Sequence, residues 1–201
     1  MPSRSSQRRQ LRERRRMLSA AEQQQRSQAV CRRLSRQKLF RTSRRIAAYL
    51  PADGEVDPRP LIELAWQLGK QVYLPVLIPW LGNRLWFARY TPDTRLASNR
   101  FGIAEPEISH RQRIAAHALD LVLTPLVGFD NNGNRLGMGG GYYDRSFSHL
   151  LRHKHWCKPR LAGLAYDFQQ LPRLSSRPWD VPLTAVVTDT DWHLFTQGNT
   201  P

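Results

Sequence analysis

Residues 46–76 alternate between apolar runs and an amphipathic segment, and this alternation constrains the fold more than any other feature of the sequence. The two apolar runs, 46–50 and 72–76, each have the length of a strand. Between them, Asp57 is a candidate helix N-cap followed by proline, and apolar side chains continue at helical spacing until Gly69. A strand, a helix and a second strand in this order predict a βαβ unit, in which the two strands lie parallel.

The remainder of the chain extends this pattern. We expect further strands at 84–90, 119–127, 161–166 and 185–188, a glycine-rich loop at 128–141, and helices at 110–118 and 142–153. The strand at 119–127 is the most apolar run in the chain, which is typical of a central parallel strand. A chain of 201 residues has the length of one domain. We therefore expect a single α/β domain over residues 1–201, with a mostly parallel sheet in the body, 46–195.

The N-terminal segment, residues 1–45, forms a basic arm. It holds 15 basic and two acidic side chains and so carries +13 of the chain's net charge of +15. The composition predicts helix over 4–38, with a break where Ser19 and Glu22 form a capping box. Seven arginines lie within residues 4–16. A basic helical arm is also typical of nucleic-acid backbone binding, so a nucleic-acid-binding protein is the alternative function, although this arm lacks interleaved aromatic residues.

The sequence lacks both a cysteine framework and a membrane or secretory segment. The only two cysteines, Cys31 and Cys157, form no disulfide framework and no CxxC metal pattern. The sequence contains no apolar run long enough to span a bilayer and no apolar segment after the charged N-terminus that would make a secretory signal. We expect a cytoplasmic protein, a monomer, without a membrane partner.

The segment 128–145 carries the chemistry, because it holds six of the chain's twelve glycines. Successive glycines allow backbone N–H groups to turn inward and bind an anion, here between a strand end and a helix start. Arg135 adds a fixed positive charge, and the Asp144 carboxylate is a suitable magnesium ligand. The spacing is neither that of a P-loop nor that of a dinucleotide fold, where a glycine would replace Tyr142. These residues predict a phosphate or nucleotide site; the plain alternative is a flexible surface loop.

The same segment resembles the signature of the 5-formyltetrahydrofolate cyclo-ligases. The resemblance rests on Arg-Leu-Gly at 135–137, three glycines at 139–141 and Tyr-Tyr-Asp-Arg at 142–145. It extends over nearly the whole chain, through matching segments at Leu18–Glu22, Tyr49–Asp57, Phe101–Pro106 and Trp179–Pro182. It implies a three-layer αβα fold and a ligase that depends on ATP and Mg²⁺. Such an enzyme converts 5-formyltetrahydrofolate, with or without a polyglutamate tail, to 5,10-methenyltetrahydrofolate, ADP and phosphate, through phosphorylation of the formyl oxygen.

The resemblance also implies roles for individual residues. The implied ATP-binding residues are Arg4, Arg8, Arg135, Leu136, Gly137, Met138, Gly139, Gly140, Gly141, Tyr142 and Tyr143. The implied folate-binding residues are Leu50, Glu55, Phe101, Met138, Gly139, Gly140, Gly141 and Tyr142. Asp144 and Asp180 would bind magnesium, and Tyr142, near the formyl group, and Arg135 would be catalytic. Arg4 departs from the family, which often has lysine here; the charge is kept and the reach changes.

Most of these residues have an ordinary structural alternative. Without the resemblance, Asp144 would be a favourable charge in a first helical turn and Asp180 a solvated loop carboxylate. Phe101 would be a core or surface aromatic residue, and Asp57 is more readily a helix cap than a ligand. A further alternative is a sugar-phosphate or CoA-handling enzyme on a similar α/β scaffold, which would not require the Tyr-Tyr-Asp run at 142–144.

Overall fold

A computed structural model describes residues 3–77, 82, 84–99, 102–107, 112–152 and 158–195. Within them, eight strands form the central sheet: β1 (Arg45–Ala47), β2 (Gln71–Leu77), β3 (Leu85–Tyr90), β6 (Arg113–Ile114), β7 (Leu121–Pro125), β10 (Arg160–Leu164), β11 (Ala185–Val187) and β12 (Trp192–Leu194). Their order across the sheet is β12-β11-β10-β7-β1-β2-β3-β6. The strands from β11 to β2 run parallel, and β12, β3 and β6 pair antiparallel at the two edges.

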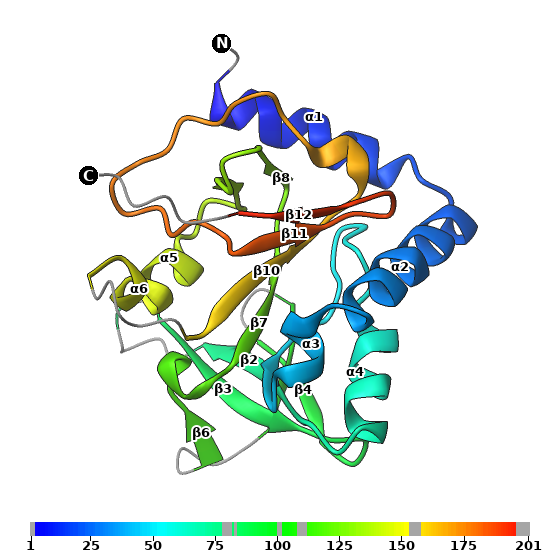
Figure 1. Cartoon of the computed structure of the whole chain (residues 1–201), viewed down its shortest axis with the longest axis vertical. Coiled ribbons are helices and arrows are strands. Elements are labelled where there is room, and N and C mark those ends of the chain that lie inside the picture. Colours follow the sequence, from blue (N-terminus) through cyan, green and yellow to red (C-terminus); the bar gives the residue numbers. More distant parts are fainter. Residues whose placement is uncertain are drawn as a thin grey trace.

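Helices cover both faces of this sheet. They are α1 (Arg4–Arg16), α2 (Ala20–Ser35), α3 (Lys38–Thr42), α4 (Arg59–Gln67), α5 (Tyr142–Phe147) and α6 (His149–Arg152). Figure 1 shows α2, α3 and α4 on one side of the sheet and α5 and α6 on the other. Each face of the sheet has its own hydrophobic core, and successive residues of β1 point into different ones. Ile46 belongs to the core on the side of α2 and α4, and Ala47 to the core on the side of α5. The prediction of a three-layer α/β fold with a mostly parallel sheet is confirmed.

The predicted βαβ unit is present as β1, α4 and β2, with Ile46 opposite Val72 in the parallel register. The helix begins at Arg59, two residues after Asp57. The Asp57 carboxylate accepts a hydrogen bond from the Arg59 amide at 2.9 Å, so it still serves the start of the helix. Gly69, at φ +67°, follows the last turn, where a left-handed residue allows the chain to leave the helix.

The arm forms two helices separated where the sequence predicts. The Ser19 hydroxyl accepts from the Glu22 amide, and the Glu22 carboxylate accepts from the Ser19 amide at 2.8 Å, which completes the capping box. Helix α1 lies across one end of the molecule, beside β8 (Gly128–Phe129) (Figure 1). Its single buried apolar side chain, Leu11, packs in a third, smaller core with Leu136 and Leu174.

The glycine-rich segment differs from the expected loop. It contains a two-stranded hairpin, β8 and β9 (Arg135–Leu136). The buried carboxylate of Asp130 fixes the turn between these strands, because it accepts hydrogen bonds from the amides of Asn132, Asn134 and Leu174. The hairpin places Arg135 on a strand, where the sequence predicts an irregular loop.

Two predicted helices are also wrong in detail. The helix expected at 142–153 breaks at Ser148 into α5 and α6, because the hydroxyls of Ser146 and Ser148 donate to carbonyls one turn back. In place of the helix at 110–118, the described part of that segment holds β6 and a 3₁₀ turn, Ala116–Ala118. Pairing with β3 decides this outcome. The hairpin of β4 (Leu96–Ser98) and β5 (Ala104–Pro106), and strand β12, are not predicted at all.

Two absences inferred from the sequence, a cysteine framework and a membrane span, can be compared with the structure. Cys31 is buried, its thiol donates to the Asp57 carbonyl, and burial raises its pKa to about 12, which makes it an inert core residue. Cys157 lies outside the described residues. No helix in the described part of the chain is long and apolar enough to cross a membrane.

Candidate active site

A cavity of about 1450 Å³ opens at the carboxyl ends of the central strands. From β1 the chain continues on one side to β2 and later on the other side to β7, so the strand order reverses at β1. Tyr49 and Leu50, just after β1, and Pro125 and Leu126, at the end of β7, line the cavity. Ligands of open α/β sheets bind at such a switch point. The topology alone therefore marks this cavity as the candidate site.

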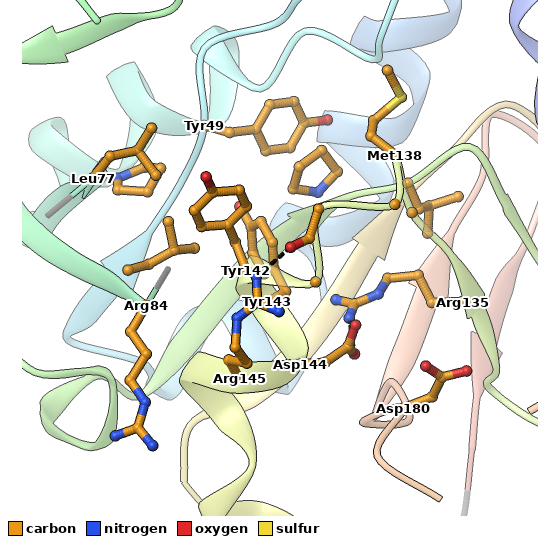
Figure 2. Close-up of a pocket in the computed structure, with 18 of the residues that line it drawn as sticks. Tyr49, Leu77, Arg84, Arg135, Met138, Tyr142, Tyr143, Asp144, Arg145 and Asp180 are labelled. Carbon is orange, nitrogen blue, oxygen red and sulfur yellow. Dashed lines mark hydrogen bonds and ion pairs between the residues drawn. The ribbon is translucent and has the colours of Figure 1, made fainter. Parts of the chain in front are cut away.

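The cavity has two different walls. We name the first the cationic wall; it comprises Arg4, Arg8, Arg135, the segment 137–141, Asp144, Arg177 and Asp180. We name the second the apolar wall; it comprises Leu50, Leu74, Pro75, Leu77, Leu85 and Leu126. Figure 2 shows Arg135, Asp144 and Asp180 on one side of the pocket and Leu77 on the other, with Tyr142 between them.

Arg135 is the most firmly held charge of the cationic wall. Its side chain is only 6% exposed, and its Nη2 donates to Asp144 Oδ1 at 2.5 Å. Its guanidinium also lies 5.4 Å from the centre of the Tyr143 ring. The other terminal nitrogen, Nη1, is shielded from solvent and has no hydrogen-bond partner among the described residues. An N–H group in that state is costly, and an anion bound in the cavity would supply its acceptor.

Glycines allow the backbone of the same segment to turn tightly beside this arginine. Gly139 and Gly141 have φ values of +100° and +65°, in the left-handed region that other residues rarely adopt. At Gly140 a Cβ atom would lie 2.9 Å from the Tyr142 ring. The segment therefore needs glycine for its path, which is stronger evidence of a built site than glycine content alone.

The arm contributes two further charges to the cationic wall. Arg4 donates from Nη1 to Asp180 Oδ2 at 2.9 Å, and Arg8 donates from Nε to the Gly137 carbonyl at 2.7 Å. Burial, followed by repulsion from Arg4 and Arg177, lowers the pKa of Arg8. Crowded cations of this kind are stabilised by a bound anion.

Of the seven arginines of α1, six have partners within the chain. Arg4 and Arg8 lie in the cavity, Arg14 lies over the Phe168 ring, and Arg12, Arg15 and Arg16 bind Asp53. Most of the arginine side chains of α1 are therefore engaged with their own chain, which weakens the nucleic-acid alternative.

Asp144 and Asp180 are the candidate magnesium ligands. The protein hydrogen bonds of the described residues reach Oδ1 of Asp144 and Oδ2 of Asp180, so one oxygen of each carboxylate is not used in this way. Three-residue clusters of metal-ligating side chains are absent from the described ranges. Two carboxylates beside a phosphate site nevertheless match the preference of Mg²⁺, which takes one or two carboxylates together with phosphate oxygens and water.

Glu55 is a further carboxylate at the cavity, and it is more buried than Asp144 and Asp180. Burial raises its pKa, and the nearby Arg15, whose Nη1 lies 3.8 Å from Glu55 Oε1, opposes that rise. Burial likewise raises the pKa of Tyr49 and of Tyr143. These two phenols therefore stay protonated near neutral pH. Glu55 is the carboxyl group that lies beside them.

The structure brings most of the predicted site residues together. Those that line the cavity are Arg4, Arg8, Leu50, Glu55, Arg135, Gly137, Met138, Gly139, Gly140, Gly141, Tyr142, Tyr143, Asp144 and Asp180. Leu136 is fully buried in the small core beside Leu11, so only its backbone is near the site. Phe101 lies outside the described residues.

Other lining residues are missed by sequence reasoning. Arg177 and Trp179 stand at the cationic wall, with the guanidinium 5.6 Å from the indole centre. Their position just before Asp180 is the signal that could have identified them. Glu105 also lines the cavity, and it accepts from Asn99 at 2.6 Å and from the Leu77 amide at 3.1 Å. Nothing in its local sequence indicates this role.

Comparisons with known proteins show which family the chain resembles. The profile of the 5-formyltetrahydrofolate cyclo-ligase family matches residues 1–189. A 5-formyltetrahydrofolate cyclo-ligase of Escherichia coli (strain K12) is 42% identical over 178 residues, which cover 89% of this chain and 96% of the relative. One of Haemophilus influenzae is 42% identical over 166 residues, covering 83% and 87%. The structure of Aquifex aeolicus 5,10-methenyltetrahydrofolate synthetase is similar with a TM-score of 0.80 and 33% identity, covering 98% of this chain and 95% of that one.

Proposed function

The chain belongs to the 5-formyltetrahydrofolate cyclo-ligase family, and from this premise we propose that it cyclises 5-formyltetrahydrofolate to 5,10-methenyltetrahydrofolate with ATP as co-substrate. ADP and phosphate are the other products. The observation that carries the proposal is Arg135, a nearly buried cation beside a glycine-rich backbone, whose Nη1 has no partner in the described part of the chain. Such a site is suited to a polyphosphate.

In this proposal the cationic wall holds the triphosphate of ATP. Arg4 and Arg8 come from α1 and donate to the carbonyls of Arg135 and Gly137, so the arm and the segment 135–141 meet at this wall. Phosphoryl transfer relies chiefly on positioning and on neutralising charge. Three guanidinium groups around the triphosphate would do both.

Asp144 and Asp180 are the residues that would hold magnesium. The residues fit it, because each carboxylate has an oxygen outside the protein hydrogen bonds described above. The ion would supply neutralising charge to the transferred phosphoryl group. Arg135 and Arg4, which bind the other oxygens of these carboxylates, would keep Asp144 and Asp180 oriented toward the site.

The apolar wall would take the folate. Leu50 and Leu126 offer apolar surface to a flat ring system, and Glu55 offers two acceptor oxygens to the amino and ring N–H groups of a pterin. Tyr142 lies between the two walls (Figure 2), so its phenol is suited to contact the formyl group. Phe101, assigned to the folate by the resemblance alone, remains a prediction.

The chemistry follows from the weakness of a formamide oxygen as a leaving group. Transfer of the γ-phosphoryl group to that oxygen breaks the bond to ADP and forms an imidate-like phosphate ester. Nitrogen 10 then attacks the activated carbon, its proton leaves, and phosphate departs as the ring closes. Arg135 would neutralise the charge of the transferred group, and Tyr142 would orient the formyl oxygen toward it.

A direct assay tests the proposal. The purified protein, 5-formyltetrahydrofolate, ATP and Mg²⁺ are combined, and the absorbance of methenyltetrahydrofolate is followed. We expect product only when ATP and Mg²⁺ are both present, and none in excess chelator. No product with all components present, or product without ATP, would refute the proposed function.

A further inference from the structure

One end of α1 lies against the cavity at Arg4 and Arg8, and its other end is fastened to the loop that carries Glu55. The carboxylate of Asp53 in this loop accepts from three arginines of α1: from Arg12 Nε at 2.6 Å, from Arg15 Nη2 at 2.9 Å, and from Arg16. Asp53 itself has a φ of +52°, in the left-handed region, which is rare for a residue with a Cβ. The loop is therefore bent around the helix at some cost in backbone strain.

Arg15 is the unusual member of this group, because its side chain is completely buried. Its Nε donates to the Asp53 carbonyl at 3.0 Å, and its Nη1 donates to the Leu126 carbonyl at 3.3 Å. The same Nη1 lies 3.8 Å from Glu55 Oε1. A guanidinium out of contact with water is costly even when it is paired, and an apolar residue would dock the helix more cheaply. The charge must have another use.

We propose that Arg15 is a positioning residue, whose guanidinium, 3.8 Å from Glu55 Oε1, keeps the Glu55 carboxylate ionised at the cavity, while the Ala52 amide donates to the other oxygen. The proposal deepens the proposed function, since it rests on the assignment of Glu55 to the folate. Through Asp53, the helix that brings Arg4 and Arg8 to the cationic wall also sets the acidic group that receives the other substrate. A carboxylate kept ionised can accept two N–H groups, whereas a protonated one would lose half of that pairing.

Several groups bear on the charge of Glu55. They are Arg12 and Arg15 on α1, the Ala52 amide and Asp53 on the same loop, and the phenols of Tyr49 and Tyr143. Burial raises the pKa of Glu55 and Asp53 adds to the rise, while Arg15 is the strongest opposing influence, followed by the Ala52 amide, which donates to Glu55 Oε2 at 3.3 Å, and by Arg12. Removing the Arg15 charge should therefore raise the pKa of Glu55 further.

The first test is a titration that requires no enzyme activity. The chain has six glutamates. Carbon-13 labelling of their side-chain carboxyl groups gives six signals, and Glu55→Gln identifies that of Glu55. We expect Arg15→Met to move this pKa upward. The matched control Arg16→Met should leave it in place, because Arg16 also binds Asp53 but is 56% exposed. An unchanged Glu55 pKa in Arg15→Met would overturn the proposal.

The second test uses kinetics in the full-length protein. At pH 7 we expect Arg15→Met to lower kcat/KM for 5-formyltetrahydrofolate about tenfold, and to move the acidic limb of its pH profile upward. In a Glu55→Gln background the same substitution should cost less than twofold, because its effect passes through Glu55. Equal losses in both backgrounds would show that Arg15 only supports the fold.

Two safeguards separate the possible failures. Methionine keeps most of the volume of arginine, and Asp53 retains Arg12 and Arg16, so we expect Arg15→Met to fold. Should it not fold, Arg15→Lys takes its place, with an upward shift of the Glu55 pKa again expected because lysine lacks the reach of the fork. If the wild-type protein shows no turnover, the proposed function fails, and the titration still decides the relation between Arg15 and Glu55.

Discussion

The cationic and the apolar walls of the cavity are built in opposite ways. The cationic wall draws most of its groups from one continuous segment, 135–145, and adds side chains from α1 and from the stretch before Val181. The apolar wall is assembled from residues in or beside four strands, β1, β2, β3 and β7, which together span residues 45–125. Handling phosphate requires fixed charges close to backbone, which a short segment can supply. Recognition of a ring system requires a shaped surface, which only the assembled sheet provides.

The largest effect should come from the centre of the cationic wall. Arg135→Met removes a nearly buried charge that faces the proposed phosphoryl group, and we expect kcat to fall about 1000-fold, or about 4 kcal/mol of barrier. Arg135→Lys keeps the charge without the fork and should recover only part of the loss. Steady-state kinetics with both substrates measures it. A fall of less than tenfold in Arg135→Met would remove Arg135 from the chemistry.

Asp144→Asn tests the magnesium assignment at the same wall. We expect a loss of about 100-fold in kcat, with partial recovery at high Mg²⁺, because the substitution removes a charge from the proposed ion site. The melting temperature should fall by a few degrees at most, since asparagine can still accept from Arg135 and from the Val181 amide. Activity within threefold of the parent at saturating Mg²⁺ would place the metal elsewhere, and Asp180 would be examined next.

Arg8→Met should have a smaller effect, confined to the substrate bound at the cationic wall. We expect the KM for ATP to rise about tenfold, while the KM for 5-formyltetrahydrofolate stays within twofold, because Arg8 belongs to the cationic wall. Arg9→Met is the matched control on the exposed side of the same helix and should change neither constant. Equal changes in both KM values for Arg8→Met would contradict the division of the cavity.

The smallest effect concerns stability at Glu55. Burial holds the pKa of this carboxyl above its usual value, so ionisation of Glu55 disfavours the folded state once the pH exceeds the unfolded pKa. We therefore expect Glu55→Gln to unfold at a slightly higher denaturant concentration than the parent at pH 7, and the difference to disappear as the pH falls below about 4. The same variant should bind folate more weakly. A loss of stability at pH 7 would show that Glu55 stabilises the fold.

The contrast between the walls also explains what could be predicted from the sequence. The βαβ unit and the Ser19–Glu22 box depend on local spacing and local hydrogen bonds, and both are present. The continuous glycine-rich segment predicts a phosphate or nucleotide site, whereas Arg4, Arg8 and Asp180 are assigned to it through the resemblance and Arg177 is missed. The hairpin that carries Arg135 has a local turn signal, Asn132-Gly133 with Asp130 binding the nearby amides, which the prediction of an irregular loop does not use. Only the bond from the distant Leu174 amide to Asp130 has no local pattern.

The apolar wall and its acidic group were harder to predict for the same reason. Glu55 was assigned through the resemblance, but its burial, and the approach of Arg15 across the loop, arise from tertiary packing. Nor does any spacing show that Glu105 would reach the cavity from β5. The sequence therefore predicts the groups that lie in one continuous segment, and it does not predict the tertiary packing that sets the charge of Glu55.

The central claim is that the two walls bring the γ-phosphate of ATP to the formyl oxygen of the folate. The most direct measurement uses 5-formyltetrahydrofolate labelled with oxygen-18 in the formyl group, with Mg²⁺ and unlabelled ATP. The account predicts that each phosphate released carries one labelled oxygen, detected by mass spectrometry, in proportion to the methenyltetrahydrofolate formed. Label that appears in water, with unlabelled phosphate, would contradict it, because the formyl oxygen would then leave without being phosphorylated.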